Sequence, residues 1–237
     1  MTNYNIFAKF YDAVMGNRAK TAERLSDFIR AANPKAKNIL ELACGTGAVL
    51  KYLSKGYKVS GLDLSSGMLA VAKKEVPQAT LYHQSMVEFK VPEKLDAILC
   101  VFDSINHLLK FGDWKKLFAS AQKHLNEGGV FIFDINTKKK LDRVISEPAG
   151  VREFGKNLMI MNVSDAGKGI SNWNVKIFEH LKKEQYRLHE EDIKEVSFSN
   201  DQILKALKPL FRSVKVIDTD KTHPNKKAER FFFVCKK

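Results

Sequence analysis

The sequence lacks the features that mark membrane, secreted and fibrous proteins. No apolar run approaches the roughly 18–20 residues that a bilayer-spanning helix needs. The first residues, Met1 to Tyr4, do not begin a basic segment followed by an apolar core, so we expect no signal peptide. Hydrophobic residues make up 44% of the 237-residue chain and charged residues 28%, which excludes a wholly disordered or collagen-like protein. The length allows one large domain, or one domain with a small addition.

Cysteine is scarce, and its three copies show neither a metal-ligand nor a disulfide pattern. Cys44, Cys100 and Cys235 lack Cys-X-X-Cys spacing, are odd in number, and each lies in an apolar run. We therefore expect reduced, buried thiols in a cytoplasmic protein without a metal site.

Negative charge is in deficit. Lys and Arg number 40 against 27 Asp and Glu, which gives a net charge of +13. Such a balance favours an anionic partner, such as RNA or a nucleotide. The charge is spread along the chain, however, with Lys138-Lys139-Lys140 as its densest run. A lysine-rich solvated surface is therefore the simpler interpretation, and nucleic acid stays the alternative partner.

Short apolar runs alternate with helical patterns over the first 135 residues. Helical spacing over 18–32 ends at Asn33-Pro34, because proline disfavours the helical conformation of the residue before it. The alternation predicts buried parallel strands covered by helices on both faces, which is an α/β fold. The expected strands are 38–43, 57–63, 80–83, 95–101 and 130–135, after a turn at Gly128-Gly129, and the further helices are 48–54, 66–75 and 113–126.

The pattern changes after residue 135, where alternating stretches at 158–163 and 171–198 flank the turn signal Asp165–Gly169. Alternation of period two predicts an antiparallel addition. The chain is expected to close with a helix and two strands, at 200–210, 213–219 and 230–235. We therefore expect a main domain of residues 1–137 and 199–237, and an inserted antiparallel β lid of residues 138–198.

The strongest local signal is Glu41-Leu42-Ala43-Cys44-Gly45-Thr46-Gly47, at the end of the first expected strand. Gly45 and Gly47 let the backbone approach a ligand, and the start of the next helix offers N–H groups to an anion. Leu50 stands where a dinucleotide fingerprint needs a small residue, so an NAD enzyme is disfavoured. The acid Glu41 suits a ligand with an ammonium group. Asp63, which ends the second strand, can accept hydrogen bonds from a ribose diol.

Together with Gly61-Leu62-Asp63-Leu64-Ser65-Ser66-Gly67-Met68-Leu69, this run resembles the class I S-adenosylmethionine-dependent methyltransferases. Among them it is similar to small-molecule enzymes of the aminosugar N-methyltransferase type. The resemblance extends to Phe7–Asp12, Phe102–His107 and Gly128–Asp134. It implies a doubly wound, Rossmann-like α/β sheet of seven strands in the order 3-2-1-4-5-7-6, with the last strand antiparallel. It also implies S-adenosyl-L-methionine as the cofactor.

The resemblance further implies the residues of the site. Asp63 would hold the ribose, Gly45 and Gly47 the methionine part, and Tyr11 the carboxylate of the cofactor. Tyr4 and His107 resemble the tyrosine and histidine that flank the acceptor amine, with His107 as the expected base because imidazole titrates near neutral pH. The expected cofactor-binding residues are Tyr11, Glu41, Ala43, Gly45, Gly47, Asp63, Leu64, Met68, Gln84, Ser85, Met86, Val101 and Phe102.

These observations predict an enzyme that transfers the methyl group of S-adenosylmethionine in line to a nitrogen or oxygen of a small molecule. Two alternatives stay open: an RNA methyltransferase, which the net charge favours, and a non-catalytic module that binds S-adenosylmethionine. We expect a cytoplasmic monomer or homodimer without membrane contact. The sequence does not predict the acceptor, because the inserted lid that would select it is the part least like the family.

Overall fold

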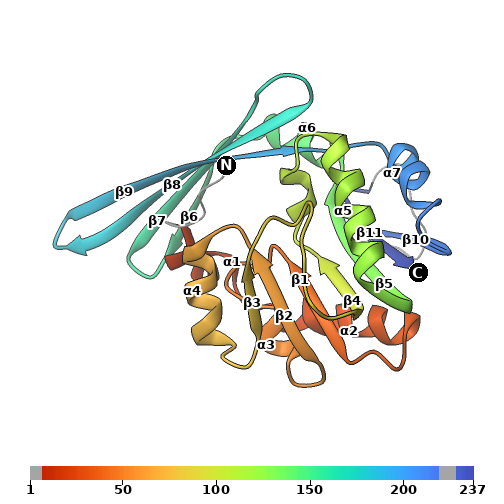
Figure 1. The fold of residues 1–237 in the computed structure, drawn as a ribbon. Helices are drawn as coiled ribbons and strands as arrows, with labels where there is room; N and C mark the ends of the chain where they lie inside the picture. Colours follow the sequence, from red (N-terminus) through yellow and green to blue (C-terminus); the bar gives the residue numbers. More distant parts are fainter. Residues whose placement is uncertain (1–6, 219–227) are drawn as a thin grey trace.

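The computed structural model describes residues 7–218 and 228–237, which fold around a seven-stranded sheet (Figure 1). Its strand order is β10 (Ser213–Asp218), β11 (Arg230–Lys236), β5 (Leu125–Asn136), β4 (Leu95–Cys100), β1 (Asn38–Leu42), β2 (Lys58–Asp63) and β3 (Thr80–His83). The pairs among β1 to β5 are parallel, whereas β11 is antiparallel to both β5 and β10. Numbered within this sheet alone, the order is 3-2-1-4-5-7-6, so the predicted Rossmann-like fold is confirmed.

Apolar residues on both faces of the strands explain why helices cover the sheet on both sides. Ile39 and Leu99 pack on one face with α2 (Ala19–Ala32) and α3 (Leu50–Leu53). Their strand neighbours Leu40 and Ile98 pack on the other face with α5 (Phe111–His124) and α7 (Asn200–Leu207). Helix α4 (Ser66–Glu75) follows β2 and has the bounds that the sequence predicts.

Among the elements that differ from the prediction are β5 and the helix that follows it. The expected turn at Gly128-Gly129 lies inside β5, which begins at Leu125. Gly128 has a φ of +75°, and the pairing of β4 with β5 shifts register between Leu95 and Ala97, so the glycines form an irregularity within the strand. The second difference is the helix α6 (Lys138–Ile145), whose start is capped by the side chain of Thr137.

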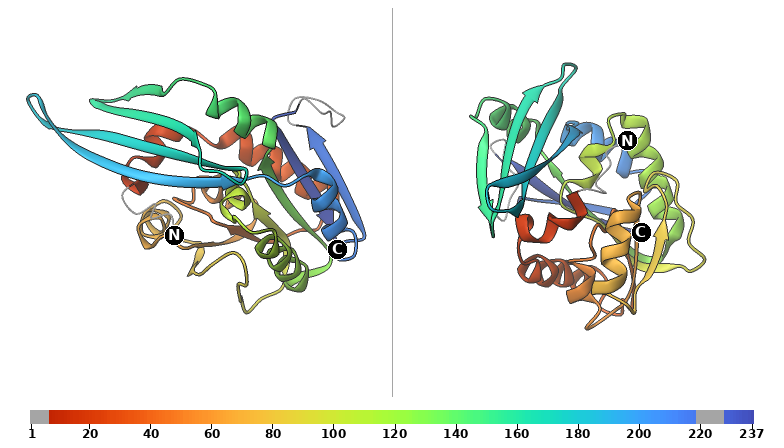
Figure 2. Two further views of the ribbon diagram at one scale, coloured as in Figure 1. Left: turned by 90° about the horizontal axis from the view of Figure 1, so that it is seen from above. Right: turned by 90° about the vertical axis from the view of Figure 1, so that its left-hand side faces the viewer.

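The predicted antiparallel addition is a separate four-stranded sheet that extends from the main sheet (Figures 1 and 2). All of its neighbouring strands are antiparallel, and the turn signal Asp165–Gly169 joins its second strand to its third. The strands are β6 (Gly150–Phe154), β7 (Asn157–Asp165), β8 (Ile170–Lys182) and β9 (Gln185–Val196). Below, residues 138–198 are called the insertion; its role as a lid stays a prediction.

The N-terminal helices η1 (Phe7–Lys9) and α1 (Tyr11–Met15) connect the insertion to the loop after β1 (Figure 2). Thr46 in that loop donates its hydroxyl hydrogen to Asp12 Oδ1 at 2.7 Å. The apolar side of the same helices packs on the insertion through Phe7, Phe10, Val14, Met159, Val175, Ile177 and Ile193. Three parts of the chain therefore meet above the carboxyl end of β1.

Gly61 in β2 allows the loop after β1 to lie directly against the neighbouring strand. A Cβ atom at this position would lie 2.7 Å from Cys44 Sγ and 2.8 Å from Leu50 Cδ1. We expect Gly61→Ala to lower the free energy of unfolding by about 1–3 kcal/mol in chemical denaturation. Gly56→Ala is the matched control, because a Cβ there would meet nothing within 4 Å. An equal loss of stability in both variants would contradict the close packing.

Candidate functional site

The carboxyl ends of β1 and β4 mark the point where the chain changes direction across the sheet. From β1 the chain continues to β2 and β3, and then returns to β4 on the other side of β1. Open α/β sheets bind ligands in the crevice at such a point. Ala43, Phe102 and Asp103, which follow these two strands, have left-handed backbone, a strain that gathers at functional sites. The other two such non-glycine residues in the described ranges, Lys168 and Lys183, lie in hairpin turns of the insertion.

The carboxylate of Asp63 holds the loop after β1 in position. The N–H of Gly45 donates to Asp63 Oδ2 at 2.9 Å, and the N–H of Ser65 donates to Oδ1 at 2.8 Å. Gly45 and Gly47 have φ values of +54° and +74°, which side-chain-bearing residues rarely adopt. Burial raises the pKa of Asp63, although the backbone donors oppose this rise. Each oxygen retains accepting capacity, because a carboxylate oxygen can accept more than one hydrogen bond.

Glu41, near the end of β1, is a buried acid. It is 3% exposed, and its Oε2 has no hydrogen-bond partner in the part of the chain that the structure describes. Burial, with a smaller contribution from the charge of Asp63, raises the pKa of Glu41 to about 8. An unsatisfied buried carboxyl group is costly unless a ligand donates to it. The ammonium group that the sequence predicts for the ligand would satisfy it.

Arg18 brings a guanidinium group to the same edge of the sheet. Its guanidinium carbon lies 4.2 Å from the centre of the Phe102 ring, and its buried Nη2 has no partner among the described residues. Burial raises the pKa of the neighbouring Tyr11 to about 12, and the charges of Arg18 and Glu41 both act on it. Near Tyr11, one nitrogen of Arg18 and one carboxyl oxygen of Glu41 thus lack partners among the described residues, and these charges are opposite in sign, as are the two ends of an amino acid. No sequence motif surrounds Arg18, so sequence reasoning missed it.

The turn after β2 presents one exposed apolar side chain beside this loop. Leu64, directly after Asp63, is 58% exposed. An aromatic ring of a ligand bound above the turn could pack on this side chain. Met68 is buried beneath the glycine loop, with its sulfur 3.9 Å from the position that a Cβ of Gly45 would take. The structure therefore brings Asp63, Leu64 and Met68 together at the loop.

The polar side chains of the segment after β3 form hydrogen bonds within that segment. The Gln84 amide donates to the carbonyl of Lys90 at 3.1 Å and accepts from its N–H at 3.0 Å. Ser85 accepts from the N–H of Val87, and Met86 is buried. A ligand at this edge would therefore meet Gln84, Ser85 and Met86 mainly through backbone groups.

Asn106 fixes the 3₁₀ helix η2 (Ser104–His107) between the main sheet and the insertion. Its Nδ2 donates to the carbonyls of Asn136, at 3.0 Å, and Val196, at 2.8 Å. Its Oδ1 accepts the N–H of Asn136 at 3.0 Å. The side chain is fully buried, so η2 has a defined position relative to both β5 and β9.

His107, the last residue of η2, faces the insertion. Its Nδ1 lies 3.2 Å from the carbonyl oxygen of Lys194 in β9. A carbonyl can only accept, so this bond requires the hydrogen on Nδ1 and leaves the lone pair on Nε2. Burial lowers the pKa of His107, although the charge of Asp103 opposes this, so the neutral ring is favoured at pH 7. Tyr4, the other predicted catalytic residue, lies outside the described residues.

A buried ionic cluster supports the strained turn between β4 and η2. Arg230 in β11 pairs with the carboxylates of Asp103 and Asp134 and donates to Asn136 Oδ1 at 3.0 Å. Asp134 Oδ2 also accepts the N–H of Asp103 at 3.3 Å. Although burial favours the neutral acid, Arg230 lowers the pKa of Asp103. The sequence does not predict this cluster, because its members come from distant segments.

The described residues show neither a metal centre nor a membrane span. Within these ranges no group of three or more His, Cys, Asp or Glu side chains could hold a metal ion. None of the helices described is long and apolar enough to cross a bilayer. The three cysteines are free and buried.

Known proteins resemble this chain over different parts of its length. Residues 39–129 match a family model described as a methyltransferase domain. A protein of Geobacillus sp. (strain WCH70) assigned as a methyltransferase is 29% identical over 248 residues, 99% of each chain. The dTDP-3-amino-3,4,6-trideoxy-alpha-D-glucopyranose N,N-dimethyltransferase of Streptomyces venezuelae is 32% identical over 131 residues. That match covers 55% of each chain, so this chain spans about half the length of the sugar enzyme.

A solved structure has the same architecture over the whole chain. The S-adenosylmethionine-dependent methyltransferase from Clostridium acetobutylicum ATCC 824 matches with a TM-score of 0.87 and 27% identity, over 98% of each chain. The predicted family, enzyme class and cofactor are thereby confirmed. The chain is an S-adenosylmethionine-dependent methyltransferase that resembles the class I enzymes of this kind.

Proposed function

We propose that this enzyme methylates an amine nitrogen of a small molecule, with an aminated sugar as the favoured acceptor class. The observation that carries the proposal is the hydrogen bond between His107 and the Lys194 carbonyl, which places the ring hydrogen on Nδ1 and the lone pair on Nε2. The similarity to the Streptomyces venezuelae N,N-dimethyltransferase, which is named for an aminated sugar nucleotide, supports the acceptor class.

The residues at the switch point fit the cofactor. When bound, S-adenosylmethionine supplies a methyl group on a positively charged sulfur, an electrophile that needs no further activation. We assign its ammonium to Glu41 and its carboxylate to Arg18, because both groups have buried atoms without partners among the described residues. The ribose hydroxyls are assigned to Asp63, and the nucleoside ring to the exposed face of Leu64.

The proposed role of His107 follows from the proton balance. An amine attacks through its lone pair, the carbon–sulfur bond breaks toward sulfur, and the new ammonium must lose a proton. Nε2 of His107 takes that proton, because Nδ1 already carries the hydrogen that is donated to Lys194. Burial keeps the imidazole neutral before the reaction, so it can act as a base at pH 7.

The inner face of the insertion offers an acidic group to a cationic acceptor. Both carboxylate oxygens of Glu191 in β9 are buried without a hydrogen-bond partner among the described residues. Burial raises the pKa of Glu191 to about 7. Glu191 precedes Lys194, the partner of His107, by three residues, about 10 Å along the strand. An ammonium-bearing acceptor would satisfy this acid, which supports nitrogen over oxygen as the methylated atom.

The basic run Lys138-Lys139-Lys140 gives little support to an RNA substrate. Lys138 Nζ pairs with Asp142 at 2.6 Å, and Lys140 Nζ donates to Asn136 Oδ1 at 2.9 Å. Asp142 offsets the exposed charge of Lys138, and Lys140 is bonded within the fold, so the run offers less net positive charge to phosphate groups than its sequence suggests. This favours the small-molecule acceptor over nucleic acid.

We also propose that the enzyme works in the cytoplasm. Cys44, Cys100 and Cys235 are free thiols buried in the core. Burial raises the pKa of all three thiols, which keeps them protonated and unreactive. Free thiols of this kind suit a reducing compartment.

Glu41 predicts a proton release when the cofactor product binds. With a pKa of about 8, this acid is mostly protonated at pH 7, and an ammonium bound to it favours the ionised form. Calorimetric titration with S-adenosylhomocysteine at pH 7, in buffers of different ionisation enthalpy, should show release of close to one proton. Glu41→Gln should abolish the release and weaken binding roughly 10- to 100-fold. Glu153→Gln, which removes an exposed carboxylate from β6, is the control; unchanged binding by Glu41→Gln would contradict the assignment.

His107→Gln should slow methyl transfer by roughly 10²- to 10⁴-fold and leave the affinity for S-adenosylhomocysteine unchanged. In the native enzyme, protonation of His107 should create an acid limb of kcat/KM with an apparent pKa below 6.5, because burial lowers the pKa. The limb should disappear in the variant. His180→Gln, in the β8–β9 hairpin, is the control. Equal turnover in the His107 variant and the native enzyme would reject a catalytic role.

A further inference from the structure

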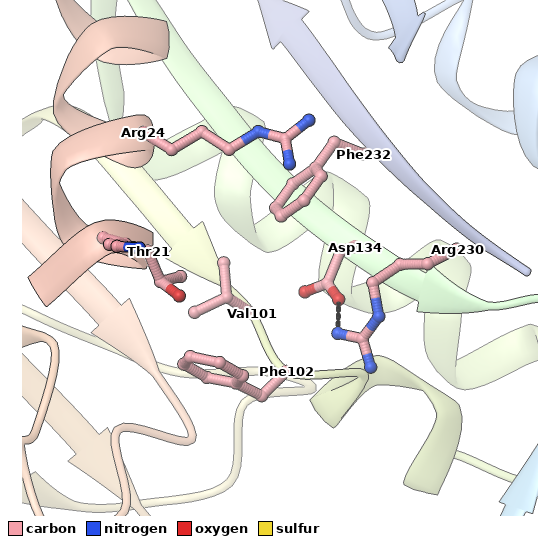
Figure 3. Close-up of a pocket in the computed structure, with 8 residues that line it drawn as sticks. Thr21, Arg24, Val101, Phe102, Asp134, Arg230 and Phe232 are labelled. Atoms are coloured by element: carbon pink, nitrogen blue, oxygen red, sulfur yellow. Dashed lines mark hydrogen bonds and ion pairs between the residues drawn. The ribbon is translucent and has the colours of Figure 1, made fainter. Parts of the chain in front are cut away.

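A cavity of about 280 Å³ lies beside the proposed cofactor site, between α2, the carboxyl ends of β4 and β5, and the amino end of β11 (Figure 3). Its lining residues are Lys20, Thr21, Arg24, Val101, Phe102, Asp134, Arg230 and Phe232. Only Val101 and Phe102 belong to the predicted cofactor contacts; Glu41, Asp63 and the glycines of the loop do not line it. The cavity is therefore a separate space on the α2 side of the turn after β4, and its volume suits a small ligand.

Asp134 gives this cavity an unsatisfied acceptor. The residue is fully buried, and its Oδ2 is used by Arg230 and by the N–H of Asp103. Its Oδ1 is buried without a hydrogen-bond partner among the described residues. Figure 3 shows one carboxylate oxygen joined to Arg230 and the other turned toward the cavity. A buried carboxylate oxygen without a donor is rare in a folded protein, and a ligand that donates a charged hydrogen bond would satisfy it.

The rest of the lining adds an apolar wall and a cationic rim. Val101, Phe102 and Phe232 provide the wall. Lys20 and Arg24 lie four residues apart on α2, so their side chains project from the same face of the helix. Arg24 lies with its guanidinium carbon 5.1 Å from the centre of the Phe232 ring, at the edge of the wall. The cavity thus combines a buried acceptor, an apolar surface and two cationic side chains.

We infer that this cavity is a second binding site, which takes an amino acid or a similar zwitterion with an apolar side chain. The ammonium group of the ligand binds Asp134 Oδ1, and its carboxylate binds Lys20 and Arg24. The apolar side chain packs on Phe102 and Phe232. The site is distinct from that of the methionine part of the cofactor, whose charged ends are assigned to Glu41 and Arg18. The inference does not depend on which acceptor the enzyme methylates.

The test is calorimetric titration of the full chain, saturated with S-adenosylhomocysteine so that the cofactor site is occupied. Three probes separate the charges: L-leucine carries both, isopentylamine only the ammonium, and 4-methylpentanoate only the carboxylate. We expect L-leucine to bind, and each one-charge probe to bind at least about 10-fold more weakly. No L-leucine binding up to about 10 mM, or equal binding of all three probes, would overturn the inference.

Variants identify the site of binding. Asp134→Asn removes the charge with little change of shape and should weaken L-leucine and isopentylamine at least about 10-fold. Lys20→Met, at an exposed position that cannot disturb the core, should weaken L-leucine and 4-methylpentanoate but not isopentylamine. Lys35→Met, at an exposed position beyond the end of α2, is the matched control. Native-like L-leucine affinity in Lys20→Met, or an equal loss in Lys35→Met, would place the ligand elsewhere and overturn the inference.

Discussion

The carboxylate of Asp63 joins the two loops on which the proposed cofactor site depends. By accepting the N–H groups of Gly45 and Ser65, it fixes the glycine turn after β1 against the start of α4. Ser65 in turn caps α4 by accepting the N–H of Met68 at 3.1 Å. A carboxylate loses hydrogen bonds to water when it is buried, and here two backbone N–H groups replace them. These hydrogen bonds within the chain preorganise the loop, and preorganisation lowers the entropic cost of binding.

The buried charges of this enzyme fall into two groups. Arg230 is paired with Asp103 and Asp134, and through them it supports the backbone that leads from β4 into η2. Glu41 and Arg18, at the switch point, have buried atoms without partners among the described residues. Groups of the first kind hold the fold, whereas unsatisfied groups in a crevice are typical of ligand sites. Asp134 belongs to both groups, because its Oδ2 pairs with Arg230 whereas its Oδ1 has no partner among the described residues.

Local pattern in the sequence predicts the central strands, helix 66–75 and the glycine loop, because apolar runs, turn residues and helix spacing act over a few neighbours. The strand order follows from the family resemblance. Arg18 and the Arg230 cluster are not predictable in this way, since Arg230 meets Asp103 across 127 positions of the chain. Helix α6 is missed because its lysine-rich start suggests surface charge, although Thr137 is a suitable cap. Gln84 is a polar residue at the end of a strand, which suggests a ligand contact. In the structure its side-chain amide instead bonds to the backbone of Lys90 and closes a loop.

The most direct test of the account is a crystal structure with S-adenosylhomocysteine bound. We expect its ammonium within hydrogen-bond distance of Glu41, its carboxylate at Arg18, and its ribose hydroxyls on the carboxylate of Asp63. The loop from Gly45 to Gly47 should keep the backbone conformation described here. A nucleoside bound in the cavity beside Asp134, or one that leaves Glu41 without a donor, would contradict the central claim.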